Sequence, residues 1–196
     1  MSEFEMKQRV KALSNITIHE EQLNEILAIF LELFPVRGAY LLRYSVLGFV
    51  GEGIIYKSSS SFRNISSLRD DIRSIPFVHE AITDKKAKYF AGYDFFVSNS
   101  NKYIIKESWE AVLVIPIVSE HLVIAYIICP EIEENVEISD DFLHISTLFG
   151  QLIGRFLSTT FKNSNNNFFK LSKRELEVMH LICNGDSIQE IADTLG

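Results

Sequence analysis

The residues that could support catalysis or metal binding are few and scattered. The five histidines are His19, His79, His121, His144 and His180. No two of them have metal-ligand spacing, and no cysteine or carboxylate recurs beside them at helical distance. Cys129 and Cys183 stand far apart, so we expect two reduced, packed thiols rather than a disulfide or a zinc site. Because no Ser-His-Asp order, phosphate-binding glycine loop or carboxylate pair is recognisable, we expect no catalytic activity, no metal and no identifiable cofactor.

Aromatic side chains are the more informative group, because they gather in the long connections between predicted elements. The candidate ligand-contacting residues are Phe62, Phe77, Tyr93, Phe95, Phe96, Tyr103 and Trp109. Large rings that surround a few polar groups are the usual lining of a small-molecule pocket. The alternative is that the same rings fill the core. The sequence does not identify a ligand.

The elements that would position these rings follow from hydrophobic periodicity and turn signals. The sequence predicts a helix after the capping-box pattern Thr17-x-x-Glu20, ended by Pro35. It then predicts strands at 39–46 and 49–56, a helix at 77–83, a strand at 87–90, a hairpin of strands 111–118 and 122–129, and a long helix from 139 to about 160. This order indicates an α+β fold, with one antiparallel sheet and helices gathered on one side of it.

Composition limits the class of protein. The chain has 196 residues, 47% hydrophobic and 23% charged, which is typical of a globular protein. No apolar run approaches the roughly 18 residues that span a bilayer, and the N-terminus lacks the order of a signal peptide, so we expect a cytoplasmic protein without membrane contact. The formal net charge of −7 argues against general nucleic-acid binding.

The asparagine-rich stretch Lys162–Asn167 marks a domain boundary. We therefore expect a first domain at residues 1–161, with its core at about 17–158, a linker at 162–170, and a small helical segment at 171–196.

Three segments of the first domain resemble a GAF domain. Pro76–Phe90 is similar to the helix of that family that leads into a strand, Glu110–Cys129 to its central hairpin with an apolar-Pro-apolar step, and Ile138–Leu157 to its closing helix. The resemblance implies a GAF/PAS-like antiparallel sheet with flanking helices, whose long connections cover the open sheet face. It also implies a small-molecule sensor, a dimerisation module, or both.

The closing helix is the expected homodimer element. Its apolar face contains Phe142, Ile145, Phe149, Leu152 and Phe156. Two alternatives remain: a ligand-free GAF domain that only binds other proteins, and a lactone receptor of the quorum-sensing type. The Trp, Tyr and Asp-Pro pattern of the lactone receptors is not visible in this chain.

The segment Leu171–Gly196 resembles the first two helices of a LuxR/GerE-type helix-turn-helix. Ser172 and Ser187 are placed to cap the two helices, each with a glutamate three residues later, and Gly185 suits the turn between them. Ile191, Ala192 and Leu195 are expected to face the first helix. The resemblance implies a DNA-binding transcriptional regulator.

That resemblance implies DNA-backbone contacts by Lys173, Arg174, Ser187 and Gln189. The chain stops at Gly196, before the recognition helix of such a module, so we expect the module to be truncated here. DNA binding is expected only of the complete protein. From Phe168 onward there are three basic and five acidic residues, which indicates no basic stripe. We therefore expect no specific DNA binding by this chain.

Overall fold

The computed structural model describes residues 3–92, 95, 109–134, 136–163, 173–184 and 186–195. Its helices are α1 (Glu3–Ala12), α2 (His19–Leu33), α3 (Pro76–Asp84), α5 (Asp140–Asn163), α6 (Lys173–Asn184) and α7 (Ile188–Leu195), with short 3-10 turns η1 (Leu13–Asn15) and η2 (Ile72–Ser74). Its strands are β1 (Val36–Ser45), β2 (Val50–Ser58), β3 (Phe62–Asn64), β4 (Arg69–Asp71), β5 (Lys88–Ala91), β6 (Ala111–Ser119) and β7 (Leu122–Ile132). The predicted α+β class is confirmed.

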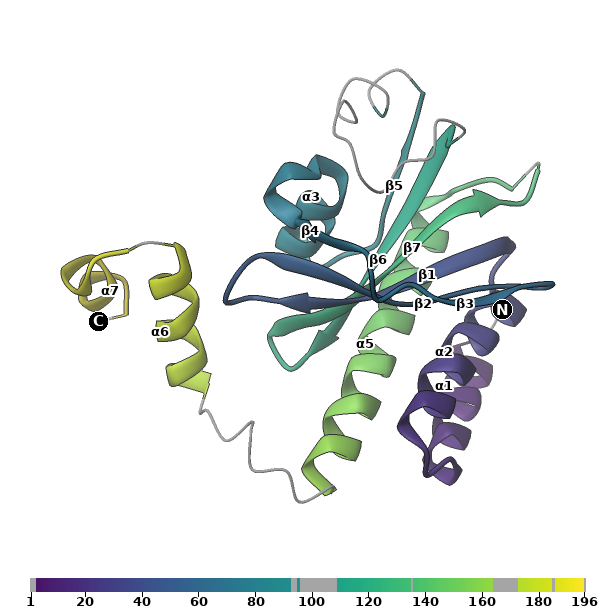
Figure 1. Cartoon of the computed structure of the whole chain (residues 1–196), viewed down its shortest axis with the longest axis horizontal. Coiled ribbons are helices and arrows are strands. Elements are labelled where there is room, and N and C mark those ends of the chain that lie inside the picture. Colours follow the sequence, from purple (N-terminus) through teal and green to yellow (C-terminus); the bar gives the residue numbers. More distant parts are fainter. Residues whose placement is uncertain are drawn as a thin grey trace.

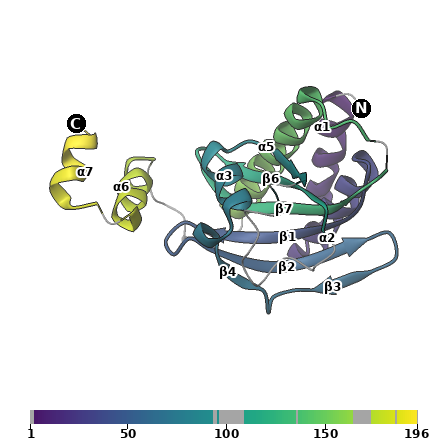
Figure 2. The same cartoon turned by 90° about the horizontal axis from the view of Figure 1, so that it is seen from above.

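The strands form one antiparallel sheet in the order β3-β2-β1-β7-β6-β5, and β4 also pairs with β2. Figure 2 shows β7, β1, β2 and β3 side by side. The predicted hairpin of β6 and β7 is confirmed, with Ser119 paired to Leu122. Glu120 has a φ of 54°, the left-handed conformation that such a tight turn requires.

Helices cover both sides of this sheet. Figure 1 shows α3 on one side and α1, α2 and α5 on the other. The expectation that the helices gather on one side is therefore wrong for α3. The reason lies in β6 and β7, whose residues are buried along both faces, so that each face needs its own cover.

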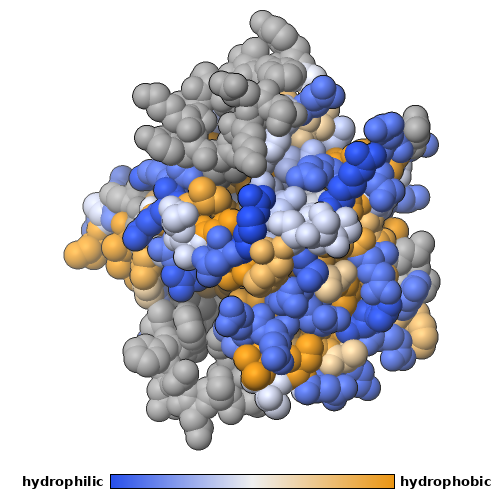
Figure 3. All heavy atoms as spheres, turned by 45° about the vertical axis from the view of Figure 1, so that its right-hand side comes forward, coloured by the Kyte–Doolittle hydropathy of each residue, from blue (hydrophilic) through white to orange (hydrophobic). Residues whose placement is uncertain are grey.

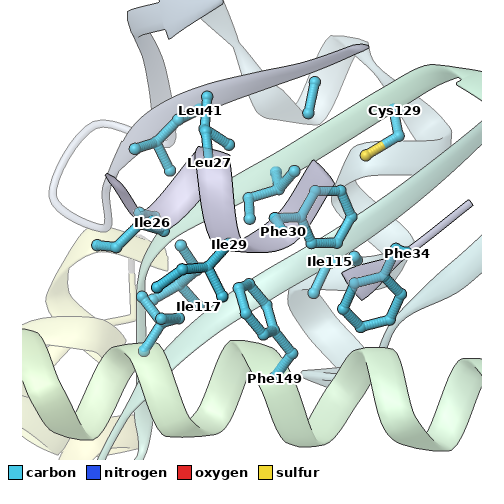
Figure 4. Close-up of a cluster of buried hydrophobic side chains, with 14 of the residues drawn as sticks. Ile26, Leu27, Ile29, Phe30, Phe34, Leu41, Ile115, Ile117, Cys129 and Phe149 are labelled. Atoms are coloured by element: carbon cyan, nitrogen blue, oxygen red, sulfur yellow. The ribbon is translucent and has the colours of Figure 1, made fainter. Parts of the chain in front are cut away.

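The side that carries α1, α2 and α5 holds the first core. Figure 4 shows its rings and aliphatic side chains, contributed by α2, by the sheet and by α5. Phe149 lies 5.4 Å from Phe30 and 5.5 Å from Phe34 between ring centroids. A Cβ at Gly154 would lie 2.0 Å from the carbonyl oxygen of Val118, so this glycine lets α5 lie directly on β6.

The N-terminal region differs from the expectation. The helix α1 was not predicted, because its mean hydropathy is low and only Met6 and Val10 are buried along it. Helix α2 begins at His19 after Ile18, and no side chain caps it, so the predicted Thr17 cap is wrong. The buried Gln22 amide donates to the Ile16 carbonyl at 2.6 Å, which is consistent with an extended chain up to the helix start.

Candidate functional site

The face of the sheet covered by α3 holds a second core with a different composition. It consists of Leu42, Ile72, Ile75, Phe77, Val78, Ala81, Ile82, Phe95, Trp109, Val112, Val114, Val123, Tyr126 and Ile128, with Tyr40, Tyr44, Phe90 and Val118 partly buried against it. Alternation along β6 and β7 sends Val114 and Ile128 to this face while their neighbours Ile115 and Ile127 enter the first core. Like the first core, it combines aliphatic groups with aromatic rings, and Tyr126 adds a fully buried phenol hydroxyl.

The structure brings three of the predicted ligand residues together on this face. Phe77 and Phe95 are almost fully buried, with ring centroids 5.6 Å apart in an edge-to-face arrangement. Trp109 is 7% exposed and lies 5.8 Å from the ring of Tyr40. The predicted residues Tyr93, Phe96 and Tyr103 lie outside the described residues.

Phe62 lies apart from that group. It stands on β3, 50% exposed, with the ammonium of Lys57 at 5.9 Å from its ring centroid. It lines a groove between β3 and the start of α2 with a volume of about 350 Å³. The groove is lined by Ile18, Glu20, Glu21, Asn24, Lys57 and Phe62.

Tyr126 carries the most unusual polar group of the second core. Its side chain is 0% exposed, and within the described part of the chain its hydroxyl has no hydrogen-bond partner. Burial raises the pKa of this phenol strongly, so the hydroxyl stays protonated. The phenol fits because residue 51 is glycine: a Cβ there would lie 2.1 Å from the Tyr126 hydroxyl oxygen. Sequence reasoning missed this pair, because a tyrosine inside an apolar strand looks like any other core residue.

Asp70 lies beside the same glycine. It pairs with Gly51 across β4 and β2, and Tyr44 pairs with Gly51 across β1 and β2. Directly paired residues project to the same face of a sheet, so both side chains lie on the side of the Tyr126 hydroxyl. Burial raises the pKa of the Asp70 carboxyl, and this carboxylate in turn raises the pKa of Tyr126, in keeping with their proximity.

A second polar group lies toward the start of β1. The Tyr56 hydroxyl donates to Glu131 Oε1 at 3.0 Å, and the Arg63 guanidinium lies 4.6 Å from the Tyr56 ring centroid. Burial, followed by the hydrogen bond to Glu131, raises the pKa of Tyr56. These groups satisfy one another, which distinguishes them from the hydroxyl of Tyr126.

Cys129 is fully buried in the first core, and burial raises the pKa of its thiol well above the usual value. The side chain of Cys183 lies outside the described residues. Over the described ranges no group of three or more histidine, cysteine or acidic side chains is placed to hold a metal ion.

The predicted dimer residues lie along α5. Phe149 and Phe156 are buried in the first core, whereas Phe142, Ile145 and Leu152 are partly buried against it. The face of α5 that carries the large rings therefore packs mainly against the sheet and α2. On the neighbouring α1, the side chain of Phe4 is 71% exposed.

The helices α6 and α7 form a helical hairpin at the predicted place. Ser187 caps α7, because the Glu190 amide donates to its hydroxyl at 3.3 Å and its own amide donates to Glu190 Oε2 at 2.8 Å. Ile191 is 9% exposed, as expected, whereas Ala192 is exposed, so its predicted contact with α6 is wrong. Helices α6 and α7 contact each other, and among residues 188–194 of α7 Ile191 is the one buried side chain.

The predicted DNA-contacting residues mostly have acidic neighbours. The Arg174 guanidinium lies 3.6 Å from Glu177, and the Gln189 amide donates to Asp193 at 3.2 Å. The hydroxyl of Ser187 donates to Glu190 at 2.7 Å. The side chain of Lys173, like the predicted cap Ser172, lies outside the described residues.

No protein-family model matches the sequence, and no curated protein matches it. Solved structures resemble it in fold. The GAF domain of an Acinetobacter phosphoenolpyruvate-protein phosphotransferase covers 86% of this chain and 99% of its own, at 9% identity and a TM-score of 0.63. Residues 122 to 287 of a methyl-accepting chemotaxis protein cover 80% of this chain and 99% of that one, at 9% identity and a TM-score of 0.61.

The phycocyanobilin-bound GAF domain of a cyanobacterial phytochrome covers 85% of this chain and 99% of its own, at 13% identity and a TM-score of 0.59. No described helix is both long and apolar enough to cross a bilayer. Identities this low carry the fold and nothing finer. The chain has the fold of a GAF domain.

Proposed function

We propose that the domain senses a small molecule on its second core, and that the chain belongs to a homodimeric, DNA-binding transcriptional regulator without catalytic activity. The observation that carries the sensing role is the fully buried Tyr126 hydroxyl, which has no hydrogen-bond partner among the described residues. Leaving such a group unpaired costs about 1–3 kcal/mol, a cost that ligand sites commonly bear. The same core contains rings such as Phe77, Phe95 and Trp109, which resemble the apolar lining of a ligand site.

The sensing role is tested on the full chain by thermal-shift screening of small molecules, followed by the fluorescence of Trp109, the one tryptophan in the sequence. A ligand that binds only the folded protein raises Tm with its concentration. We expect such a compound also to change the emission of Trp109, because that ring lies in the second core. A ligand-free interaction domain would give no compound that does both.

The role in transcription rests on the α6–α7 hairpin and its resemblance to half of a helix-turn-helix. Ile182 is 58% exposed and Ile188 is 88% exposed, so the hairpin leaves apolar side chains uncovered. Glu177 lies beside Arg174, and Asp193 accepts a hydrogen bond from Gln189. The negative charges of these two carboxylates oppose contacts between the hairpin and DNA phosphates. We expect gel-shift assays with random DNA pools to show no sequence-selective binding by this chain, and salt-resistant selective binding would contradict that expectation.

Homodimerisation is proposed through α1 and α5, which pack side by side. The strongly exposed Phe4 would be covered in such a dimer, as would the exposed sides of the partly buried Ile145 and Leu152. Figure 3 shows the surface from a direction turned by 45° from Figure 1, with hydrophilic residues between separate apolar areas. We expect analytical ultracentrifugation to show a dimer that Phe4→Glu weakens, with Phe62→Glu as the control on a distant exposed ring. A monomer at every concentration would exclude this role.

A further inference from the structure

Three polar side chains from three strands meet at Gly51, at one end of the second core. The Tyr126 hydroxyl comes from β7 and lies over this glycine, and Asp70 and Tyr44 flank it on the paired strands β4 and β1. The methyl end of Ile72 would be 2.5 Å from a Cβ at residue 51, so it closes the other side. The result is a small polar site at the edge of an otherwise apolar layer.

The charges around this site are unbalanced. Asp70 has no hydrogen bond or ion pair among the described residues, and burial alone raises its pKa. The nearest arginines in sequence are used elsewhere: Arg69 lies 3.6 Å from Glu52, and Arg73 lies 2.6 Å from Asp71. Asp71 faces away, because neighbouring residues of a strand alternate between its two sides. No resident cation in the described chain therefore balances Asp70.

The chemistry of the two unpartnered groups selects a ligand class. An ionised carboxylate only accepts hydrogen bonds, and a phenol oxygen can accept one as well. An anionic ligand would be repelled by Asp70, and a purely apolar one would leave both groups unsatisfied. A protonated nitrogen satisfies both, because it has several N–H donors and a charge opposite to that of Asp70.

We propose that Asp70 and Tyr126 bind the protonated amine of a ligand whose apolar part packs among the rings of the second core. This inference rests on the proposed sensing function and adds the ligand's chemical class. The ammonium donates to the Asp70 carboxylate and to the Tyr126 hydroxyl oxygen, while Gly51 leaves room for the phenol. The apolar part packs among the apolar side chains and rings of this core.

The test uses the full chain and three probes that share one phenylethyl group: phenethylamine, phenethyl alcohol and hydrocinnamate. They differ only in a cationic, neutral or anionic end. Binding is followed by Trp109 emission and by Tm at neutral pH. We expect phenethylamine to bind at least about tenfold more tightly than the alcohol, since a charge-assisted hydrogen bond replaces a neutral one. Hydrocinnamate should bind most weakly.

Two variants locate the effect. Asp70→Asn and Tyr126→Phe should each reduce the preference for the amine over the alcohol by about tenfold, while binding of the alcohol changes little. Asp71→Asn and Tyr89→Phe are the matched controls, because they remove the same chemical groups outside the site. Circular dichroism shows whether each variant is folded. Both controls should keep the full preference.

The outcomes separate this inference from the proposed function. If the alcohol binds as tightly as the amine, or if Asp70→Asn leaves the preference intact, the amine site is wrong and the sensing role stands. If hydrocinnamate binds most tightly of the three probes, the amine site is likewise wrong and the sensing role stands. If no probe changes Trp109 emission or Tm, the amine site is wrong, and screening that yields no ligand at all then removes the sensing role as well.

Discussion

Both faces of the sheet carry a core of buried side chains, yet the two cores are built differently. The first core, between the sheet and helices α2 and α5, consists of aliphatic groups and phenylalanine rings such as Phe30 and Phe149. The second core, under α3, contains the phenols of Tyr126 and Tyr40 beside similar apolar groups. A chain needs one apolar core in order to fold, but a buried phenol without a partner weakens the fold. The contrast is that the second face buries a phenol hydroxyl for which the described residues offer no hydrogen-bond partner, whereas the first core consists mainly of apolar side chains.

The largest effect is expected in the first core. Phe149→Ala removes a fully buried ring that contacts Phe30 and Phe34, so it should lower the free energy of unfolding by about 3–5 kcal/mol. Denaturant unfolding followed by circular dichroism measures this change. Leu47→Ala, at a side chain that is 61% exposed, should change stability by under about 0.5 kcal/mol. A small loss for Phe149→Ala would show that the two faces are not distinct in this way.

Gly51→Ala is the corresponding steric test of the second core. The added carbon would lie 2.1 Å from the Tyr126 hydroxyl oxygen and 2.5 Å from Ile72, so side chains must move. Overpacking of this kind costs about 1–3 kcal/mol, and it should also abolish ligand binding. In the control Gly48→Ala the nearest atom, on Val50, is 3.2 Å away, so a smaller change in denaturant midpoint is expected. Equal effects of the two variants would contradict the close packing at residue 51.

Tyr126→Phe should act in the opposite direction from most core substitutions. It keeps the ring and removes a buried hydroxyl that has no hydrogen-bond partner in the described part of the chain, so the free energy of unfolding should rise by about 1 kcal/mol. Tyr89→Phe, at a partly buried ring on β5, should be close to neutral. Thermal and denaturant unfolding of both variants measures the difference. A clear loss of stability for Tyr126→Phe would mean that the hydroxyl has a partner in the free protein.

The smallest effect concerns pH and the neighbouring pair Asp70 and Asp71. The pKa of Asp70 in the folded state is raised above its ordinary 3.8 by burial, so its ionisation opposes folding. This penalty is absent below pH 3.8 and grows as pH rises through the folded-state pKa. Asp70→Asn should therefore raise Tm slightly at neutral pH and leave it unchanged in acid.

Asp71 provides the control with the opposite sign. The hydrogen bond from Arg73 holds the pKa of its carboxyl below 3.8, so its ionised form stabilises the fold above that pH. Asp71→Asn should lower Tm slightly at neutral pH, with the loss fading as pH falls through the lowered pKa. Its effect stays small because the pair is exposed. If Tm against pH changed with the same sign in both variants, the assignment of Asp70 to a desolvated site would be wrong.

Much of the fold could be predicted because its signals are local. The β6–β7 hairpin, the helix α5 and the capping pair Ser187 and Glu190 each depend on residues close together in the chain. The helix α1 was missed because only a few of its residues are apolar, and β3 and β4 were missed because their short, exposed sequences resemble loops. Of the rings assigned to one ligand site, Phe77, Phe95 and Trp109 share a core, whereas Phe62 lies on β3. The sheet order that separates them is not a local property.

The sequence by itself determined that the strands would form an antiparallel sheet with helices packed on it, because periodicity and turn chemistry act over a few residues. That both faces of the sheet would need a cover was not visible in it. Only the tertiary structure decided that Tyr126, Gly51 and Asp70 would meet. They come from β7, β2 and β4, and their contact depends on strand order and register. A single-residue shift in that register would turn Asp70 to the other face, so no local pattern could have revealed the site.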